Sequence, residues 1–447
     1  MRDIKNITSD KKRSRFRLSH RREHNLFHSS RRLFEGKREQ RRLRLLLPIV
    51  ALLLGVYPVA SLFFSTKSAI SSVKKSAPVP VKPLGQLDSF QSFQLAADSL
   101  PAVRQNGESF QAPLPDGGTI VYAINRELQE RVKKVMSTYR LPYGAFVAIE
   151  PKTGRVLALV GHSSLDPSWE RRSYFGLYPM ASLFKIVTAA AALEEKKVSP
   201  DTKFAFRGKN TSVNPKYWYV KPGTHNQEMP LATAMGKSVN PVFGRLASDV
   251  VGRTSIMSCV ERFGFNQPLL PGTCVPPSKA ESPQSDAELK LMGAGLGREV
   301  KISPFHVALM MAAIANDGVM MMPSLAQEVK NGKGETIFTL KPQTARRIVT
   351  SETASQLAKM LSTTVSSGTS RKAFHDRRGR PKLASIDIAA KTGTIDGKDP
   401  AGHYSWFAAY APTNDPQIAL VALIVNQEKW KIKASYLGEQ ALEAFFK

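Results

Sequence analysis

Cysteine is almost absent from this chain of 447 residues, which contains only Cys259 and Cys274. Fourteen residues separate the two, which is not a spacing that zinc ligands use, and the eight histidines form no HExxH pattern or other cluster. We therefore expect neither a metal nor another cofactor. In an oxidising compartment the two thiols could form a disulfide that contributes about 3 kcal/mol, and two free thiols are equally compatible with the sequence.

Acidic residues are also scarce, since 36 Asp and Glu stand against 64 Lys and Arg, and the formal net charge is +28. Residues 1–44 hold 16 Lys and Arg against 5 Asp and Glu, a net charge of +11, which leaves +17 for the rest of the chain. This basic tail contains no recognisable nucleic-acid-binding module. A nucleic-acid partner is therefore not expected.

Charge is missing altogether from Leu45 to Phe64, twenty residues that read LLLPIVALLLGVYPVASLFF. As a helix, twenty residues cover about 30 Å, the thickness of a membrane's hydrocarbon core. The basic stretch Arg41–Arg44 predicts that residues 1–44 stay in the cytoplasm and that residues 65–447 lie outside. A cleaved signal peptide fits less well, because the preceding leader is long and no AxA site follows. We expect a single-pass membrane protein.

The remaining chain is predicted to form a tether and one domain. Residues 65–118 are rich in Ser, Pro and Gln with little apolar periodicity, which indicates an extracytoplasmic tether. From residue 119 to residue 447 an early strand hairpin is followed by many helical patterns and then by strands again. No internal repeat is visible. This order predicts an α+β fold, with an antiparallel sheet built from both ends of the domain and flanked by helices.

The triplet Lys-Thr-Gly occurs twice in the domain and requires its surroundings for interpretation. The first copy, Lys152–Gly154, lies between two apolar runs and reads as the turn of a hairpin, in which Gly154 supplies a positive φ. The second copy, Lys391–Gly393, lies inside a strand pattern. We expect chemistry only at the second copy.

A serine nucleophile needs a base beside it, and SxxK at the start of a helix brings the two side chains onto one face. Of four SxxK matches, only Ser182/Lys185 opens an apolar helical pattern, in which burial would lower the pKa of the lysine. SxN occurs twice, and Ser238/Asn240, between two apolar helical stretches, is a better candidate than Ser212/Asn214. A loop between helices can direct a hydroxyl and an amide into a cleft.

These motifs follow one another as SxxK, then SxN 56 residues later, then KTG 209 residues after the serine. In this order they resemble the transpeptidase domain of penicillin-binding proteins. The resemblance covers about residues 118–447 and includes the stretches FVAIEPKTGRVLALV, GAGLGREVKISPFHVALMMAAIANDG and SWFAAYAP. It implies a five-stranded antiparallel sheet with an all-helical subdomain, in a bacterial cytoplasmic membrane protein whose catalytic domain lies outside.

The resemblance also implies roles for individual residues. Ser182 would attack the carbonyl of a D-Ala-D-Ala stem peptide or of an inhibitory β-lactam, and Lys185 would act as the base. Ser238 would pass a proton to the leaving group, and Asn240 would hold the substrate amide. The substrate's terminal carboxylate would be bound by Lys391, Thr392 and Thr394, while Gly393 keeps the strand bare. The backbone N–H groups of Ser182 and Thr394 would form the oxyanion hole.

The sequence departs from the family pattern in two respects. Ala181 precedes the serine where glycine or a similarly small residue is usual. Only some fifty residues separate the expected membrane span from the domain, too few for the large pedestal domain of anchored monofunctional members. No glycosyltransferase region precedes the domain, so a separate glycan-polymerising glycosyltransferase is a conceivable partner.

Several activities are compatible with these motifs. The function expected first is D,D-transpeptidation, which cross-links stem peptides through an acyl-serine intermediate. A D,D-carboxypeptidase differs only in releasing the acyl group to water, and the sequence does not separate the two. A β-lactamase-like hydrolase fits less well, because no ExxLN stretch lies between Asn240 and Lys391. A β-lactam or muropeptide sensor fits less well, because such receptors tend to have several transmembrane helices and a cytoplasmic effector, whereas one span is expected here. An inactive scaffold fits less well, because every catalytic position is filled.

Overall fold

The computed structural model describes residues 84–447. The expected cytoplasmic tail (residues 1–44), the expected membrane span (45–64) and the first part of the expected tether therefore lie outside the described residues. Within residues 84–447, no helix combines the length and the apolar character that crossing a membrane requires.

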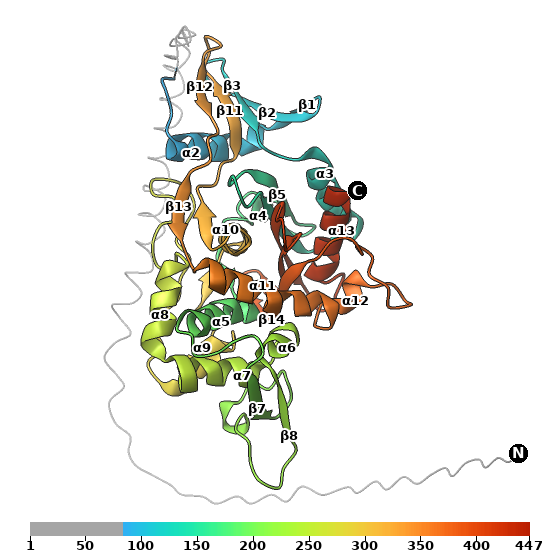
Figure 1. Cartoon of the computed structure of the whole chain (residues 1–447). Coiled ribbons are helices and arrows are strands. Elements are labelled where there is room, and N and C mark those ends of the chain that lie inside the picture. Colours follow the sequence, from blue (N-terminus) through green and yellow to red (C-terminus); the bar gives the residue numbers. More distant parts are fainter. Residues whose placement is uncertain (1–83) are drawn as a thin grey trace, which may run out of the picture. The chain divides into compact units, whose positions relative to one another are not determined.

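The centre of the fold is a five-stranded antiparallel sheet built from segments far apart in the chain (Figure 1). Its strands, in spatial order, are β14 (Ala389–Lys398), β15 (Ala401–Ala411), β16 (Ile418–Asn426), β4 (Tyr143–Ile149) and β5 (Val156–His162). The late strand β16 pairs with the early strand β4, with Val421 opposite Val147. The predicted α+β fold with a sheet from both ends of the domain is confirmed.

The sheet buries both of its faces, because successive side chains of a strand point to opposite sides. All nine residues of β16 are buried. Val421 and Leu423 contribute to the core on the side of α10 (Pro304–Ala315), whereas Leu420 and Ala422 contribute to the core formed with α3 (Arg126–Thr138) and α13 (Ala434–Phe446). Two helical layers therefore cover a strand that reads in sequence as one continuous apolar run.

The covering helices begin and end where the sequence indicates. In α3, Leu128, Val132 and Met136 lie on one face and are completely buried. In α10, the side chain of Ser303 caps the first turn, and the chain leaves the helix before Gly318, which has a φ of +80°. These helices fix the sheet from both sides.

The region between β5 and β14 is mostly helical and is arranged around α5 (Phe184–Glu194). Its other helices are α6 (Leu231–Gly236), α7 (Asn240–Arg245), the π-helix η4 (Leu246–Val251), α8 (Arg253–Arg262), α9 (Asp286–Gly293) and α11 (Ser351–Ser366). The expectation of an all-helical subdomain is wrong, because a hairpin of β7 (Lys203–Arg207) and β8 (Asn226–Pro230) extends from this region (Figure 1). Phe204 and Phe206 point to one side of β7, and this period of two favours a strand.

Residues 84–118 are folded, so the expectation of a tether as far as residue 118 is wrong for this part. They contain the helix α2 and the first two strands of a second five-stranded sheet (Figure 1). The elements are α2 (Ser89–Ser99), β1 (Arg104–Asn106), β2 (Ser109–Pro113), β3 (Thr119–Tyr122), β11 (Ala326–Lys330) and β12 (Thr336–Thr339).

The second sheet depends on contacts between distant segments, which a local pattern does not reveal. Phe93 of α2 is fully buried, and its ring centroid lies 6.3 Å from that of Phe175 and 5.6 Å from that of Phe305. The carboxylate of Asp116 accepts hydrogen bonds from the backbone N–H groups of Gly118 (2.9 Å) and Gly332 (3.1 Å). Partners more than 200 residues away thus hold a segment that reads as polar.

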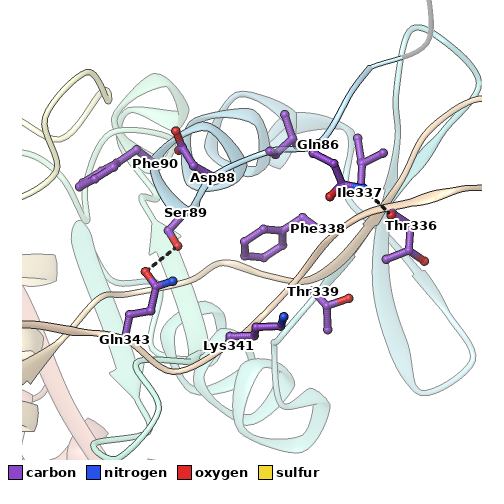
Figure 2. A pocket seen from close by; sticks show the side chains of 11 residues that line it. Gln86, Asp88, Ser89, Phe90, Thr336, Ile337, Phe338, Thr339, Lys341 and Gln343 are labelled. Atoms are coloured by element: carbon purple, nitrogen blue, oxygen red, sulfur yellow. Dashed lines mark hydrogen bonds between the residues drawn. The ribbon is translucent and has the colours of Figure 1, made fainter.

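A pocket of about 510 Å³ lies between the start of α2 and the edge strand β12 (Figure 2). The chain before α2 is held to β12 by a hydrogen bond from the backbone N–H of Leu87 to the carbonyl of Ile337 (3.0 Å). Across the pocket, Ser89 Oγ donates to Gln343 Oε1 (3.1 Å; Figure 2). None of the sequence-predicted site residues lines this pocket.

The remaining elements connect these layers. They are η1 (Leu100–Ala102), α4 (Pro167–Glu170), β6 (Tyr178–Pro179), η2 (Ala181–Leu183), η3 (Pro215–Tyr217), β9 (Lys301–Ile302), β10 (Val319–Met321), β13 (Thr344–Arg347) and α12 (Arg371–Phe374). Strand β6, which pairs with β9, comes just before η2, the single 3-10 turn that leads into α5.

Candidate active site

The SxxK motif lies where η2 passes into α5, in the middle of the fold. Ser182 is in the 3-10 turn and partly exposed, whereas Lys185 is in the first turn of the α-helix and completely buried. Ala181 has a φ of +54°, a left-handed conformation that costs a residue with a Cβ about 1 kcal/mol or more. This explains why glycine or another very small residue suits the position before the serine.

The Lys185 amine makes three short polar contacts inside the protein. Its Nζ lies 2.8 Å from Ser182 Oγ, 2.8 Å from Asn240 Oδ1 and 2.5 Å from the carbonyl oxygen of Ala294. Burial, and secondly the charge of Lys391, hold the pKa of Lys185 well below its ordinary value of 10.5. The amine is therefore neutral at a pH where an exposed lysine carries a charge.

A neutral amine fits these three contacts. It has two N–H donors, which the oxygens of Asn240 and Ala294 accept, and one lone pair. In the structure Lys185 Nζ donates to Ser182 Oγ at 2.8 Å; once the amine is neutral, its lone pair can face Ser182 and accept the hydroxyl proton across the same separation. This is the arrangement that lets a lysine remove a proton from a serine hydroxyl.

The second motif occupies the loop between α6 and α7, as predicted. Ser238 has a φ of +56°, and Asn240 is the first residue of α7 and is buried. Asn240 is engaged at both ends of its amide, because Oδ1 accepts from Lys185 and Nδ2 donates to the carbonyl of Ser212 (3.3 Å). One lone pair of Oδ1 stays available for a substrate N–H.

The second KTG copy lies on β14, the edge strand of the central sheet. Lys391 is fully buried and donates from Nζ to Ser238 Oγ (2.8 Å) and to the carbonyl of Thr392 (2.8 Å). Burial lowers the pKa of Lys391 to about 7. Lys391 thus ties the SxN loop to the edge of the sheet.

Gly393 is required by the segment that carries the serine. A Cβ added at Gly393 would lie 3.2 Å from Ala181 Cβ and 3.3 Å from Trp406 Cβ, closer than ordinary van der Waals contact. Because Gly393 has no side chain, as expected of this strand from its sequence, the turn at Ala181 can pack closely against it. Gly295 approaches the same turn from the other side, since its Cβ would lie 2.3 Å from the carbonyl oxygen of Ala181.

The three motifs converge on one pocket of about 430 Å³. Six of the eight sequence-predicted site residues line it directly, namely Ser182, Ser238, Asn240, Thr392, Gly393 and Thr394. The other two, Lys185 and Lys391, lie beneath the surface and bond to residues of the lining. All eight are therefore brought together.

Three parts of the site were missed in the sequence. The Ala294 carbonyl, within the GAGLG stretch, accepts from the catalytic lysine candidate. Thr369 lines the pocket and shares a hydrogen bond with Thr392, Oγ1 to Oγ1, at 2.6 Å. The discounted SxN copy also matters, because the Ser212 carbonyl holds Asn240 and Val213 lines the pocket. Of these three parts, only the one that contains Ala294 could have been recognised in the sequence, because the glycines of GAGLG indicate a close approach of the backbone.

The first KTG copy, Lys152–Gly154, is not part of the pocket formed by the three motifs. It forms the predicted turn between β4 and β5, with a φ of +78° at Gly154. Lys152 is 64% exposed and pairs with Asp415 at 2.7 Å. Neither residue lines the pocket. The prediction that this copy is a hairpin turn is confirmed.

The two cysteines lie outside the pocket lining and are not bonded to each other. Cys259 is buried against α5, with Sγ 3.6 Å from the Val187 carbonyl oxygen, and Cys274 is exposed. Among residues 84–447, no group of three or more His, Cys, Asp or Glu residues is placed to hold a metal ion.

The fold and the site place a serine beside a buried lysine, between a helix and the edge strand of an antiparallel sheet, as a serine acyl-transfer domain requires. Residues 144–446 match the model of the penicillin-binding protein transpeptidase domain. Because the match spans more than half of the chain, the chain belongs to this family.

Similar proteins agree with this assignment. The chain is 28% identical over 357 residues to peptidoglycan D,D-transpeptidase PbpA of Mycolicibacterium smegmatis. The aligned region covers 72% of this chain and 70% of that protein. The D,D-transpeptidase domain of a peptidoglycan glycosyltransferase from Eggerthella lenta superimposes with a TM-score of 0.62 at 27% identity, over 74% of this chain and 83% of that one. PBPA from Mycobacterium tuberculosis gives a TM-score of 0.60 at 25% identity, over 74% and 81%.

We predict that Gly393→Ala lowers the free energy of unfolding by about 1–3 kcal/mol, because the added methyl group is forced against Ala181 and Trp406. In the double variant Ala181→Gly/Gly393→Ala the first of these contacts is removed, so part of the loss should be recovered. Urea unfolding of the four proteins of this double-mutant cycle measures the coupling.

Gly85→Ala is the matched control for this prediction. An added Cβ at Gly85 meets no atom within 4 Å, so its effect should stay within about 0.5 kcal/mol. A coupling free energy near zero between positions 181 and 393 would contradict the close approach that the structure describes.

Proposed function

We propose that this protein is a peptidoglycan D,D-transpeptidase that cross-links stem peptides through an acyl-serine intermediate. The observation that carries the proposal is the fully buried Lys185, whose Nζ lies 2.8 Å from Ser182 Oγ. A neutral lysine beside a partly exposed serine, at the floor of a pocket, is the minimal apparatus for acyl transfer. The name of the M. smegmatis relative supports the same activity.

In the first half of the reaction, Ser182 Oγ attacks the carbonyl carbon between the two D-Ala residues of the donor peptide. Lys185 takes the hydroxyl proton, and the carbonyl oxygen becomes negatively charged. The backbone N–H groups of Ser182 and Thr394 stabilise that charge, and each donor is worth about 3 kcal/mol of barrier. When the C–N bond breaks, the proton that Lys185 took is passed through Ser238 to the leaving D-Ala amine; Ser238 Oγ accepts a hydrogen bond from Lys391.

In the second half, an amine of another stem peptide attacks the acyl ester. The amine gives up a proton to Lys185 as the new amide bond forms, the C–O bond to Ser182 breaks, and Ser182 Oγ takes that proton from Lys185. Thr392 and Thr394, which line the pocket on the edge strand, bind the terminal carboxylate of the donor in the first half. Asn240 positions Lys185 and accepts from the donor's amide N–H.

Water in place of the acceptor amine would make the protein a D,D-carboxypeptidase, and the same water on a β-lactam adduct would make it a hydrolase. Both alternatives use the same acylation, so acylation alone does not separate them. A β-lactam sensor would be acylated in the same way, and it fits less well because such receptors usually have several membrane spans, whereas one is expected here. An inactive scaffold fits less well, because it has no need for a buried lysine in contact with the serine.

The substrates we propose lie outside the cytoplasmic membrane of a bacterium. Residues 45–64 would cross that membrane once, residues 1–44 would stay in the cytoplasm, and the catalytic domain would be exported. A glycan-polymerising glycosyltransferase would be a partner, because cross-linking uses glycan strands that carry stem peptides. β-Lactams would act as inhibitors; the M. tuberculosis PBPA structure is also known as a penicillin G acyl-enzyme complex.

The activity itself is tested by supplying the purified protein with disaccharide-pentapeptide strands and separating the products. We expect cross-linked dimers together with an equal amount of free D-Ala, because each cross-link releases one D-Ala. Release of D-Ala without dimers, at several acceptor concentrations, would contradict transpeptidation and favour the carboxypeptidase.

A fluorescent penicillin should label the protein covalently, and only through Ser182. Ser182→Ala should abolish labelling, and Lys185→Ala should slow it by roughly 10²–10⁴-fold because the base is lost. The two KTG lysines are a matched pair: Lys391→Ala should slow labelling strongly, whereas Lys152→Ala, at an exposed turn, should leave it unchanged. Gel fluorescence after timed reactions measures all four variants.

Labelling that persists in Ser182→Ala would refute the assignment of the nucleophile. Equal loss of labelling in Lys391→Ala and Lys152→Ala, with both proteins folded by circular dichroism, would refute the assignment of the second KTG copy.

Between pH 7 and pH 9 the rate of acylation should rise with pH by much less than tenfold per unit. The base must be the neutral amine, and burial holds the pKa of Lys185 well below 10.5, so a larger fraction of it is neutral in this range than of an exposed lysine. A lysine of ordinary pKa would instead give about a tenfold rise in rate per pH unit. Stopped-flow acylation across this range distinguishes the two profiles, and a tenfold rise per unit would contradict the neutral-base mechanism.

A further inference from the structure

The pocket formed by the three motifs is lined by polar residues, by the apolar residues Val213, Leu296 and Trp406, and by two lysines. Of the fifteen lining residues, Lys237 and Lys433 are the two that carry charged side chains, and none is Asp or Glu. The charge of the lining therefore favours an anionic ligand, and Lys237 and Lys433 are the two side chains of the lining that could pair with it.

Lys391, the cation expected to bind the substrate carboxylate, is poorly placed as a free charge. It is completely buried, and its Nζ already donates to Ser238 Oγ and to the carbonyl of Thr392. The hydroxyls of Thr392 and Thr394 donate hydrogen bonds but bring no charge. A carboxylate on the edge strand therefore needs a positive charge from another element.

Lys433 lies next to that part of the edge strand. It is the last residue before α13, and the backbone N–H of the following Ala434 donates to Ser405 Oγ (3.1 Å). Ser405 is directly opposite Thr394 in the ladder between β14 and β15, so the two side chains lie on one face about 5 Å apart. Lys433, Ser405 and Thr394 all line the pocket.

The ring of Trp430 lies beside the Lys433 side chain, with Lys433 Nζ 6.0 Å from the ring centroid. Trp430 stacks on His403 with ring centroids 5.9 Å apart and planes inclined by 13°. His403 in turn lies opposite Asp396 on β14. Lys237, the other charged residue of the lining, follows α6 and precedes Ser238.

We propose that Lys433 binds the free C-terminal carboxylate of the substrate together with Thr392 and Thr394, and so selects for peptides and β-lactams that carry this carboxylate. The assignment rests on the proposed acyl-transfer function. An exposed ammonium that forms one charge-assisted hydrogen bond to the carboxylate contributes about a tenfold preference. Lys433 would then be a substrate-binding residue on an element that none of the three motifs includes.

The test compares one penicillin as the free acid and as its methyl ester, with acylation of Ser182 followed as the second-order rate constant. The unmodified protein should react faster with the acid. Lys433→Ala should react about tenfold more slowly with the acid and at an unchanged rate with the ester, while Lys433→Arg should retain the preference. Lys431→Ala, at an exposed lysine of the same loop outside the pocket lining, is the matched control.

Added salt gives a second readout, since rising sodium chloride should slow acylation of the unmodified protein by the acid but hardly affect Lys433→Ala. The proposal is overturned if Lys433→Ala reacts with the acid at the unmodified rate, or if it loses the same factor with acid and ester. Failure of the acyl-transfer function itself appears differently, as absent labelling of the unmodified protein or persistent labelling of Ser182→Ala.

Discussion

The exclusion of water from Lys185 is the constraint on which the site depends. An amine with no exposure is stable there only when its donors are satisfied, and Asn240 and Ala294 supply the two acceptors. α5 must therefore lie at the centre of the helical region, enclosed by α7, α8, α9 and α11. The same enclosure lowers the pKa of Lys185, so packing and reactivity have one cause.

Close backbone approaches bring the three motifs together, and small residues make them possible. Gly295 and Gly393 let two segments reach the turn at Ala181 from opposite sides. A similar approach occurs behind the KTG strand, where the Thr369 N–H donates to the Gly236 carbonyl at 3.0 Å. There a Cβ at Gly368 would lie 2.2 Å from that carbonyl oxygen, so glycine places Thr369 beside Thr392.

The sequence predicts those features that arise from local pattern or from motif chemistry. The helix α10 with its Ser303 cap, the hairpin at Gly154, the late strands and the convergence of the eight site residues all belong to this group. The second sheet, Thr369 and the Ser212 carbonyl do not, because each acquires its role from a partner far away in the chain. A polar stretch such as residues 84–118 shows its buried face only when β11 and β12 are present.

The pairing of β16 with β4 also determines when during synthesis the site comes into being. Ser182 and Lys185 are made early, but β14, which carries Lys391, and β15 and β16, which connect it to β4, are made late, before only α13. Such contacts between distant segments give a fold of high contact order, which forms slowly and late. The nascent chain therefore carries its serine without the surroundings that activate it, and reactivity arises only with the completed sheet.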